Sequence, residues 1–225
     1  MISRALKLST ALVVLTVAPV ANAGHMTSWY MGLEAGANWA GDADIAVDTI
    51  DPFFLGGYPA SSADFDAGWG GMATFGYAWE DWRVELEFGL RENDFDAISG
   101  PPGFAGAGDM QQFSQMINVI REIDLGGNCV LSLGAGIGGN SVSIHNGLHA
   151  PSLDGDDYGM AWQFVAGISH QIKPGIDLVL NYRYFNTDGP NIVEDEAGII
   201  HNDSWVDVNQ HTLTIGLRFD LTPGI

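Results

Sequence analysis

Alternation of side-chain polarity over residues 81–93 constrains the fold more than any other feature of this sequence. Every even-numbered position from 82 to 90 is large and apolar, whereas the odd-numbered positions from 83 to 93 are Arg, Glu, Glu, Gly, Arg and Asn. Successive side chains of a strand point to opposite faces, so one face is apolar and the other carries four charges. The stretch predicts a strand whose charged face meets partners in a shared interior.

The same alternation recurs along the chain. Seven further candidate strands lie at residues 29–39, 69–78, 113–124, 131–138, 162–169, 178–184 and 212–219. Most are about ten residues long, which is the length that a tilted strand needs to cross a bilayer. The predicted fold class is therefore all-β, with eight antiparallel strands.

Short and long connections alternate between these strands. The tight turns are residues 79–82, 125–128 and 173–175, and the long connections are residues 40–66, 94–109, 140–157 and 186–207. Outer-membrane barrels have short periplasmic turns and longer extracellular loops. This alternation predicts an up-and-down transmembrane β-barrel with its long loops outside the cell.

A soluble barrel and a membrane barrel are built from the same alternating strands but turn the apolar face in opposite directions. The soluble kind encloses apolar side chains, and the membrane kind turns them toward lipid. Charges on the strand that contains Arg83 could not line an apolar pocket, which favours the membrane kind. The predicted lipid-facing wall comprises Leu33, Phe75, Val84, Leu86, Phe88, Leu133, Phe164, Leu180, Leu213 and Leu217.

Tryptophans supply a second argument for a membrane. Six of them fall at or near the ends of the predicted strands, where membrane interfaces concentrate Trp and Tyr. These predicted interfacial aromatics are Trp29, Trp39, Trp69, Trp79, Trp82 and Trp162.

The first 23 residues are predicted to be a secretory signal peptide. Arg4 and Lys7 precede a short apolar run at residues 11–20, and Ala23 completes a small-x-small cleavage site. We therefore expect residues 24–225 to form a single barrel domain. With 28 acidic and 8 basic residues the chain has a net charge of −20, which argues against binding to nucleic acid. Cys129 is the single cysteine, so the chain contains no intrachain disulfide.

Several motifs resemble those of the OmpA-like outer-membrane β-barrel proteins. Gly-Tyr at 76–77 followed by Arg-Val-Glu-Leu-Glu at 83–87 is similar to the signature hairpin of that porin-like family. Further similarity to its later strands lies at residues 116–119, 134–138, 161–167, 181–184 and 211–218. The resemblance implies an eight-stranded barrel in the outer membrane of a Gram-negative bacterium.

The polar faces of the strands supply the first candidate site. Arg suits bidentate pairing with carboxylates in a tight space, and an eight-stranded barrel is just wide enough for side chains to fill it. The predicted network of salt bridges in the lumen comprises Glu34, Arg83, Glu85, Glu87, Arg91, Arg183 and Arg218. It is interpreted as a closed, stabilised interior, with a gated narrow pore as the alternative.

The four long loops supply the second candidate site. They carry 18 Asp and Glu residues and neither Lys nor Arg, so the predicted outer surface is strongly acidic. Hard cations prefer carboxylate oxygens, which makes Asp154, Asp156 and Asp157 the densest candidate for a metal site. That stretch lacks the full twelve-residue calcium loop, and no metal site or other cofactor is predicted.

Histidines near the loops supply the third candidate site. His145, His149, His201 and His211 lie in or beside the loops, with Ser143 and Ser204 nearby. A nucleophile needs a base within hydrogen-bond reach and a third group that orients the base. No motif of this kind surrounds these residues, so no catalytic residue is predicted and the chain is not expected to be an enzyme.

These observations predict an outer-membrane barrel with a structural or surface-recognition role. The alternatives are a narrow pore for small solutes and a hydrolase that modifies lipid A. The expected partners are outer-membrane lipid and lipopolysaccharide, together with an extracellular ligand of the loops that the sequence does not identify. A monomer is expected.

Overall fold

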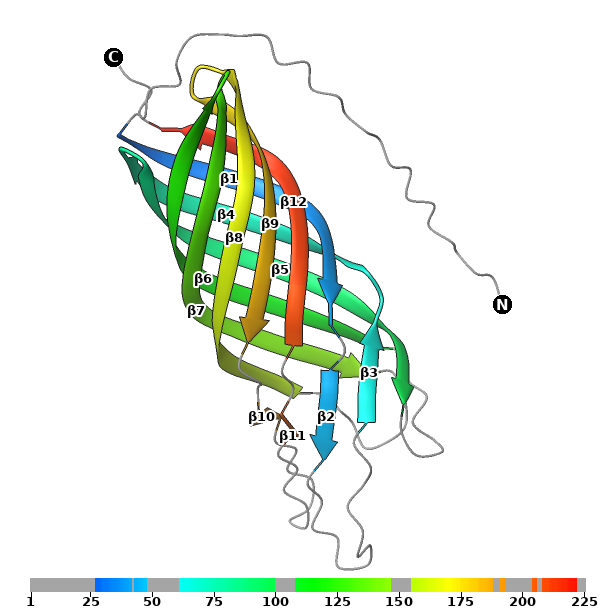
Figure 1. Ribbon diagram of the computed structural model, residues 1–225. Helices are drawn as coiled ribbons and strands as arrows, with labels where there is room; N and C mark the ends of the chain where they lie inside the picture. The colour runs from blue at the N-terminus through cyan, green and yellow to red at the C-terminus, as the bar shows by residue number, and fades with distance from the viewer. Residues whose placement is uncertain are drawn as a thin grey trace, which may run out of the picture.

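A single closed ring of eight antiparallel strands forms the body of the protein (Figure 1). The computed structural model describes residues 27–41, 43–47, 61–99, 108–146, 155–187, 191–192, 204–205 and 208–221. The ring strands are β1 (Ser28–Ala40), β4 (Gly68–Trp79), β5 (Trp82–Ser99), β6 (Gly108–Gly126), β7 (Cys129–Asn146), β8 (Gly155–Lys173), β9 (Ile176–Thr187) and β12 (Val208–Asp220). Each pairs with its neighbour in the chain, and β1 pairs with both β4 and β12 to close the ring.

The predicted tight turns lie at one end of the barrel. They join β4 to β5, β6 to β7 and β8 to β9, and each places a residue at positive φ: Glu80 at 49°, Asn128 at 66° and Gly175 at 76°. Gly126 and Gly127 adopt φ of 79° and 63°, a left-handed conformation that glycine reaches without steric cost. The eight-stranded antiparallel fold and its short connections are confirmed.

Four ring strands are longer than the sequence pattern indicated. β5, β6, β7 and β8 contain 18 or 19 residues each, so the ends of these strands away from the tight turns occupy much of what was expected to be loop. Trp162 consequently lies inside β8, seven residues from its first residue, and the expectation that it lies at or near a strand end was wrong. The predicted polarity alternation ends before these strands do, whereas hydrogen-bonded pairing of the backbone continues to their long-loop ends.

Four short strands extend the sheet beyond the ring at the long-loop end (Figure 1). They are β2 (Ala43–Val47), β3 (Ser61–Phe65), β10 (Asn191–Ile192) and β11 (Ser204–Trp205). β3 pairs with the end of β5, β2 with β3, β11 with β2, and β10 with β11. The first and fourth long connections are therefore joined by backbone hydrogen bonds.

Exposure follows the parity of each ring strand. Leu86 and Phe88 are 47 % and 45 % exposed, whereas Glu85 and Glu87 on the same strand are buried. The apolar side chains thus line the outside of the cylinder, and polar ones fill it. The described residues contain no helix long and apolar enough to cross a membrane.

Candidate functional site: the charged lumen

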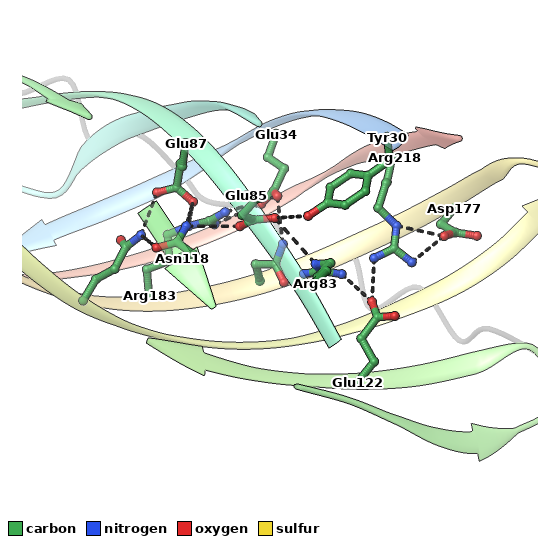
Figure 2. Close-up of polar contacts among 12 residues, drawn as sticks. Tyr30, Glu34, Arg83, Glu85, Glu87, Asn118, Glu122, Asp177, Arg183 and Arg218 are labelled. Carbon is green, nitrogen blue, oxygen red and sulfur yellow. Dashed lines mark hydrogen bonds and ion pairs between the residues drawn. The ribbon is translucent and has the colours of Figure 1, made fainter. Parts of the chain in front are cut away.

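All seven residues of the predicted network lie on the inner face of the ring. Their side chains are buried or nearly so, and the most exposed is Arg218 at 14 %. Six of them, all except Arg91, belong to two clusters along the barrel axis, which we call the periplasmic cluster, near the short turns, and the central cluster (Figure 2).

The periplasmic cluster is centred on Glu122. Its carboxylate accepts hydrogen bonds from Arg83 Nη1 at 2.5 Å and from Arg218 Nη1 at 2.9 Å. Arg218 also donates to Asp177 at 2.7 Å from Nη2. Both guanidinium groups lie 5.6 Å from the ring centroid of Tyr30. Two buried cations thus share one carboxylate and one aromatic ring.

The central cluster is built around Arg183. Its Nη1 and Nη2 donate to the two oxygens of Glu34 at 3.0 and 3.2 Å, and its Nε donates to Glu87 at 3.0 Å. Nη1 also donates to Thr214 at 2.8 Å. The fork of one guanidinium therefore joins two carboxylates, a geometry that lysine could not reproduce.

Carboxamides link the two clusters. Asn118 donates to Glu85 at 3.1 Å and to Glu87 at 3.4 Å, and Gln163 donates to Glu87 at 3.0 Å. Tyr30 donates from its hydroxyl to Glu85 at 2.7 Å. Both Glu85 and Glu87 are therefore hydrogen-bonded as well as paired, which is what a buried carboxylate requires.

Two ion pairs cross the full width of the barrel. Around the ring the strands run β1, β4, β5, β6, β7, β8, β9, β12 and back to β1. Arg183 on β9 and Glu87 on β5 stand on opposite sides of that ring, as do Arg218 on β12 and Glu122 on β6. Side chains from opposite walls thus meet directly at two depths of the lumen.

Arg91 lies inside the barrel but outside both clusters. It donates to Ser114 at 2.8 Å and to Thr212 at 3.4 Å, and its guanidinium stacks on Phe185 at 4.1 Å. No salt bridge to Arg91 is found in the described part of the chain, and its Nη2 has no hydrogen-bond partner there. The prediction that Arg91 forms salt bridges in the network was therefore wrong, although its position inside the barrel agrees with the prediction.

The prediction missed two carboxylates. Glu122 and Asp177 form three of the salt bridges in the periplasmic cluster. The sequence could have predicted both, because Glu122 falls on the same face of β6 as Asn118, and Asp177 falls on the same face of β9 as Arg183.

The predicted lipid-facing residues all lie on the outer face. Eight of the ten are 43–57 % exposed, and Val84 and Leu217 are half-buried. Trp29 stacks with Phe75 near the short turns, and Trp162 contacts Phe164 and Tyr184 toward the loops. Of the six predicted interfacial tryptophans, Trp29, Trp39, Trp69 and Trp82 are exposed, and Trp79 and Trp162 are half-buried.

The remaining predictions fall partly outside the described residues. Asp154, His149 and His201 lie there, as do the side chains of Asp156, Asp157, His145 and Ser204. Ser143 is half-buried on the outer wall of β7. His211 bonds to the hydroxyl of Tyr182 at 2.6 Å, and His170 contacts the Cys129 sulfur at 3.3 Å. No group of three metal-ligating side chains occurs among the residues that the structure describes.

Comparison with known proteins points to one family. A family model described as the outer membrane protein beta-barrel domain matches residues 8–219. A comparison with curated proteins found no match.

Three solved structures are similar in fold. Neisserial surface protein A is 19 % identical with a TM-score of 0.53 over 86 % of this chain and 97 % of its own. OprG from Pseudomonas aeruginosa is 16 % identical with a TM-score of 0.54, covering 87 % and 98 %. AlkL, solved by solid-state NMR in lipid bilayers, is 12 % identical with a TM-score of 0.54, covering 94 % and 100 %. At these identities the likeness establishes the fold alone.

Proposed function

The chain belongs to the outer-membrane β-barrel protein family, and on that premise we propose that it is a non-conducting barrel with a structural or surface-recognition role, its lumen plugged by the Arg and Glu network. It resides in the bacterial outer membrane, and residues 1–23 are the signal peptide removed during export. Its loop end faces the cell exterior. We propose that it acts without catalysis.

The two ion pairs that cross the lumen carry this proposal. The Arg183–Glu87 pair is 3.0 Å long and the Arg218–Glu122 pair 2.9 Å, and the two pairs lie at different depths. A solute moving along the axis would have to break both. Each pair is buried, so breaking it would leave charges without partners in a medium of low polarity.

Close packing around the network supports a plug. A cavity next to the clusters, lined by Tyr30, Glu34, Arg83 and Arg218 among others, has a volume of about 10 Å³. That is room for about one water molecule, and a hydrated ion needs several.

The sheet beyond the ring supports a role at the cell surface. β2, β3, β10 and β11 join the first and fourth long connections into one extension of the barrel wall. A paired sheet presents side chains at fixed spacings, whereas an unpaired loop must first lose conformational entropy on binding a partner.

Conductance across a planar bilayer tests the plug. The wild-type barrel is expected to be silent. The quadruple variant Glu87→Ala/Arg183→Ala/Glu122→Ala/Arg218→Ala, which removes both crossing pairs without changing net charge, is expected to show step conductances. The matched control is Asp81→Ala/Arg121→Ala, which removes an exposed pair outside the barrel and is expected to stay silent. Steady conductance of the wild type would support the narrow pore instead, and a silent quadruple variant would mean that the two crossing pairs are not what closes the lumen.

A further inference from the structure

The outer wall of the barrel differs in charge between its two sides. On β5 and β6, the outward positions near the long-loop end carry three carboxylates, those of Glu92, Asp94 and Asp109. On β8, β9, β12 and β1, no outward side chain in the described part of these strands is acidic. An anionic group that lies against the wall is therefore repelled on the first side and not on the second.

Aromatic rings cover the second side near the long-loop end. Tyr184 and His211 are cross-strand neighbours with ring centroids 5.3 Å apart, and the Trp162 ring lies 5.5 Å from that of Tyr184. Trp39 is paired with His211 in the register of β1 and β12. We call these four residues the aromatic face. Such rings gather where hydrocarbon meets the headgroups, so this face lies at headgroup level.

Two N–H donors project from the same side. Asn209 Oδ1 accepts hydrogen bonds from the Tyr184 hydroxyl at 2.9 Å and from Asn186 Nδ2 at 2.6 Å. His211 Nδ1 bonds to the Tyr182 hydroxyl at 2.6 Å, and when Tyr182 donates, the neutral imidazole carries its proton on Nε2. Within the described strands, no partner is found for Asn209 Nδ2 or His211 Nε2, and both side chains are exposed. Both nitrogens are thus available to a ligand with acceptor oxygens.

Apolar side chains continue this side of the wall toward the membrane centre. Phe164, Leu180 and Leu213 lie nearer the short turns than the aromatic face and are 43–57 % exposed. A sugar ring presents C–H groups on its faces and hydroxyls at its edge, so it packs on aromatic rings while its oxygens accept hydrogen bonds. The order of rings and donors above bare hydrocarbon matches an amphiphile with a sugar headgroup.

We propose that the aromatic face binds the phosphorylated saccharide headgroup of one outer-leaflet glycolipid. A sugar ring packs on Trp162 and Tyr184. Hydroxyl and phosphate oxygens accept from Asn209 and His211, and the acyl chains lie on the apolar side chains below. The assignment rests on the proposed orientation of the barrel, with its long loops outside the cell, and is independent of whether the lumen conducts.

Native mass spectrometry of the detergent-solubilised full barrel tests this proposal. The protein is mixed with equal amounts of lipid A, phosphatidylglycerol and phosphatidylethanolamine. We expect one lipid A to be retained in preference to the other two, because phosphatidylglycerol is anionic without a sugar ring and phosphatidylethanolamine has neither a sugar ring nor a net charge. Neither orientation nor conductance affects binding in detergent, so a negative result overturns this proposal and leaves that of a plugged lumen standing.

Asn209→Asp locates the site with the smallest change in structure. The carboxylate still accepts from Tyr184 and Asn186 but replaces the free N–H donor by a charged acceptor. It is expected to reduce the preference for lipid A by about tenfold, because one hydrogen bond is lost and phosphate is repelled. The matched control is Gln111→Glu, which adds the same charge to the exposed outer face of β6 and is expected to leave the preference unchanged.

His211→Phe tests the second donor. Phenylalanine keeps an aromatic ring beside Tyr184 and removes the Nε2 donor, so the preference is expected to fall again. Equal retention of the three lipids, an unchanged preference in Asn209→Asp or His211→Phe, or an equal loss in Gln111→Glu would each overturn the proposal. Heat-dependent mobility on gels confirms that each variant is folded.

Discussion

The Arg183→Ala variant is expected to unfold at a much lower temperature than the wild-type barrel. Arg183 is the only cation that bonds to both Glu34 and Glu87 within the described strands, and all three side chains are at most 5 % exposed. Its removal leaves two carboxylates buried without the cation that they share. Breaking a buried pair by removing one partner costs about 3–5 kcal/mol of unfolding free energy, and here two pairs break at once. The measurement is the thermal midpoint in detergent, followed by gel mobility before and after heating.

Arg91→Met is the matched control for that experiment. Arg91 is 2 % exposed, so it is about as buried as Arg183, but it has no salt bridge among the described residues. Methionine keeps much of the side-chain volume and the contact with Phe185 while removing the cost of burying an unpaired charge. The midpoint is expected to stay the same or rise. A fall as large as that of Arg183→Ala would show that burial of any arginine, and not its pairing, sets the stability.

The Ile117→Arg variant is expected to be the most damaging change on the outer wall. Ile117 is 53 % exposed on β6, between Leu86 of β5 and Ile137 of β7. An arginine on the lipid face near the bilayer centre costs about 2–4 kcal/mol, whereas one near the interface costs about 0–1 kcal/mol. Refolding into lipid vesicles, measured by urea titration, gives the change in free energy.

Leu125→Arg is the matched control, because it introduces the same side chain at a different depth in the membrane. Leu125 is 56 % exposed on the same strand but lies beside the turn to β7. The same substitution there is expected to cost about 0–1 kcal/mol. Wild-type Arg121 already occupies the outer face near that end, paired with Asp81 and 5.0 Å from the Trp82 ring. Equal costs at positions 117 and 125 would contradict the assignment of the outer wall to lipid.

The outer wall was predictable because it depends on parity alone. Leu86 and Phe88 point outward for the same reason that Glu85 and Glu87 point inward, and any closed antiparallel sheet preserves that alternation. Turn positions were predictable as well, since Pro174-Gly175 and the Gly126–Gly127 pair are local signals. Strand lengths were harder to predict from the sequence. The sequence pattern loses its alternation outside the membrane, yet β5 and β7 continue to pair there.

Pairing within the lumen was only partly predictable. Parity assigned Arg83, Arg183 and Arg218 to the inner face, and each forms salt bridges there. It assigned Arg91 to the same face with equal strength, although that side chain packs on Phe185. Whether an inward arginine forms a salt bridge depends on its depth along the barrel axis, and parity carries no information about that depth.

The sequence by itself determined the polarity of the cylinder: which side chains face lipid, which face the lumen, and at which end the short turns lie. Only the tertiary structure decided which charges meet, as when Glu87 reaches Arg183 across the ring or Glu122 lies between Arg83 and Arg218. Strand tilt and stagger cause this difference. They set the height of each inward residue when the sheet closes, so residues 96 positions apart in the chain come to the same level on opposite walls.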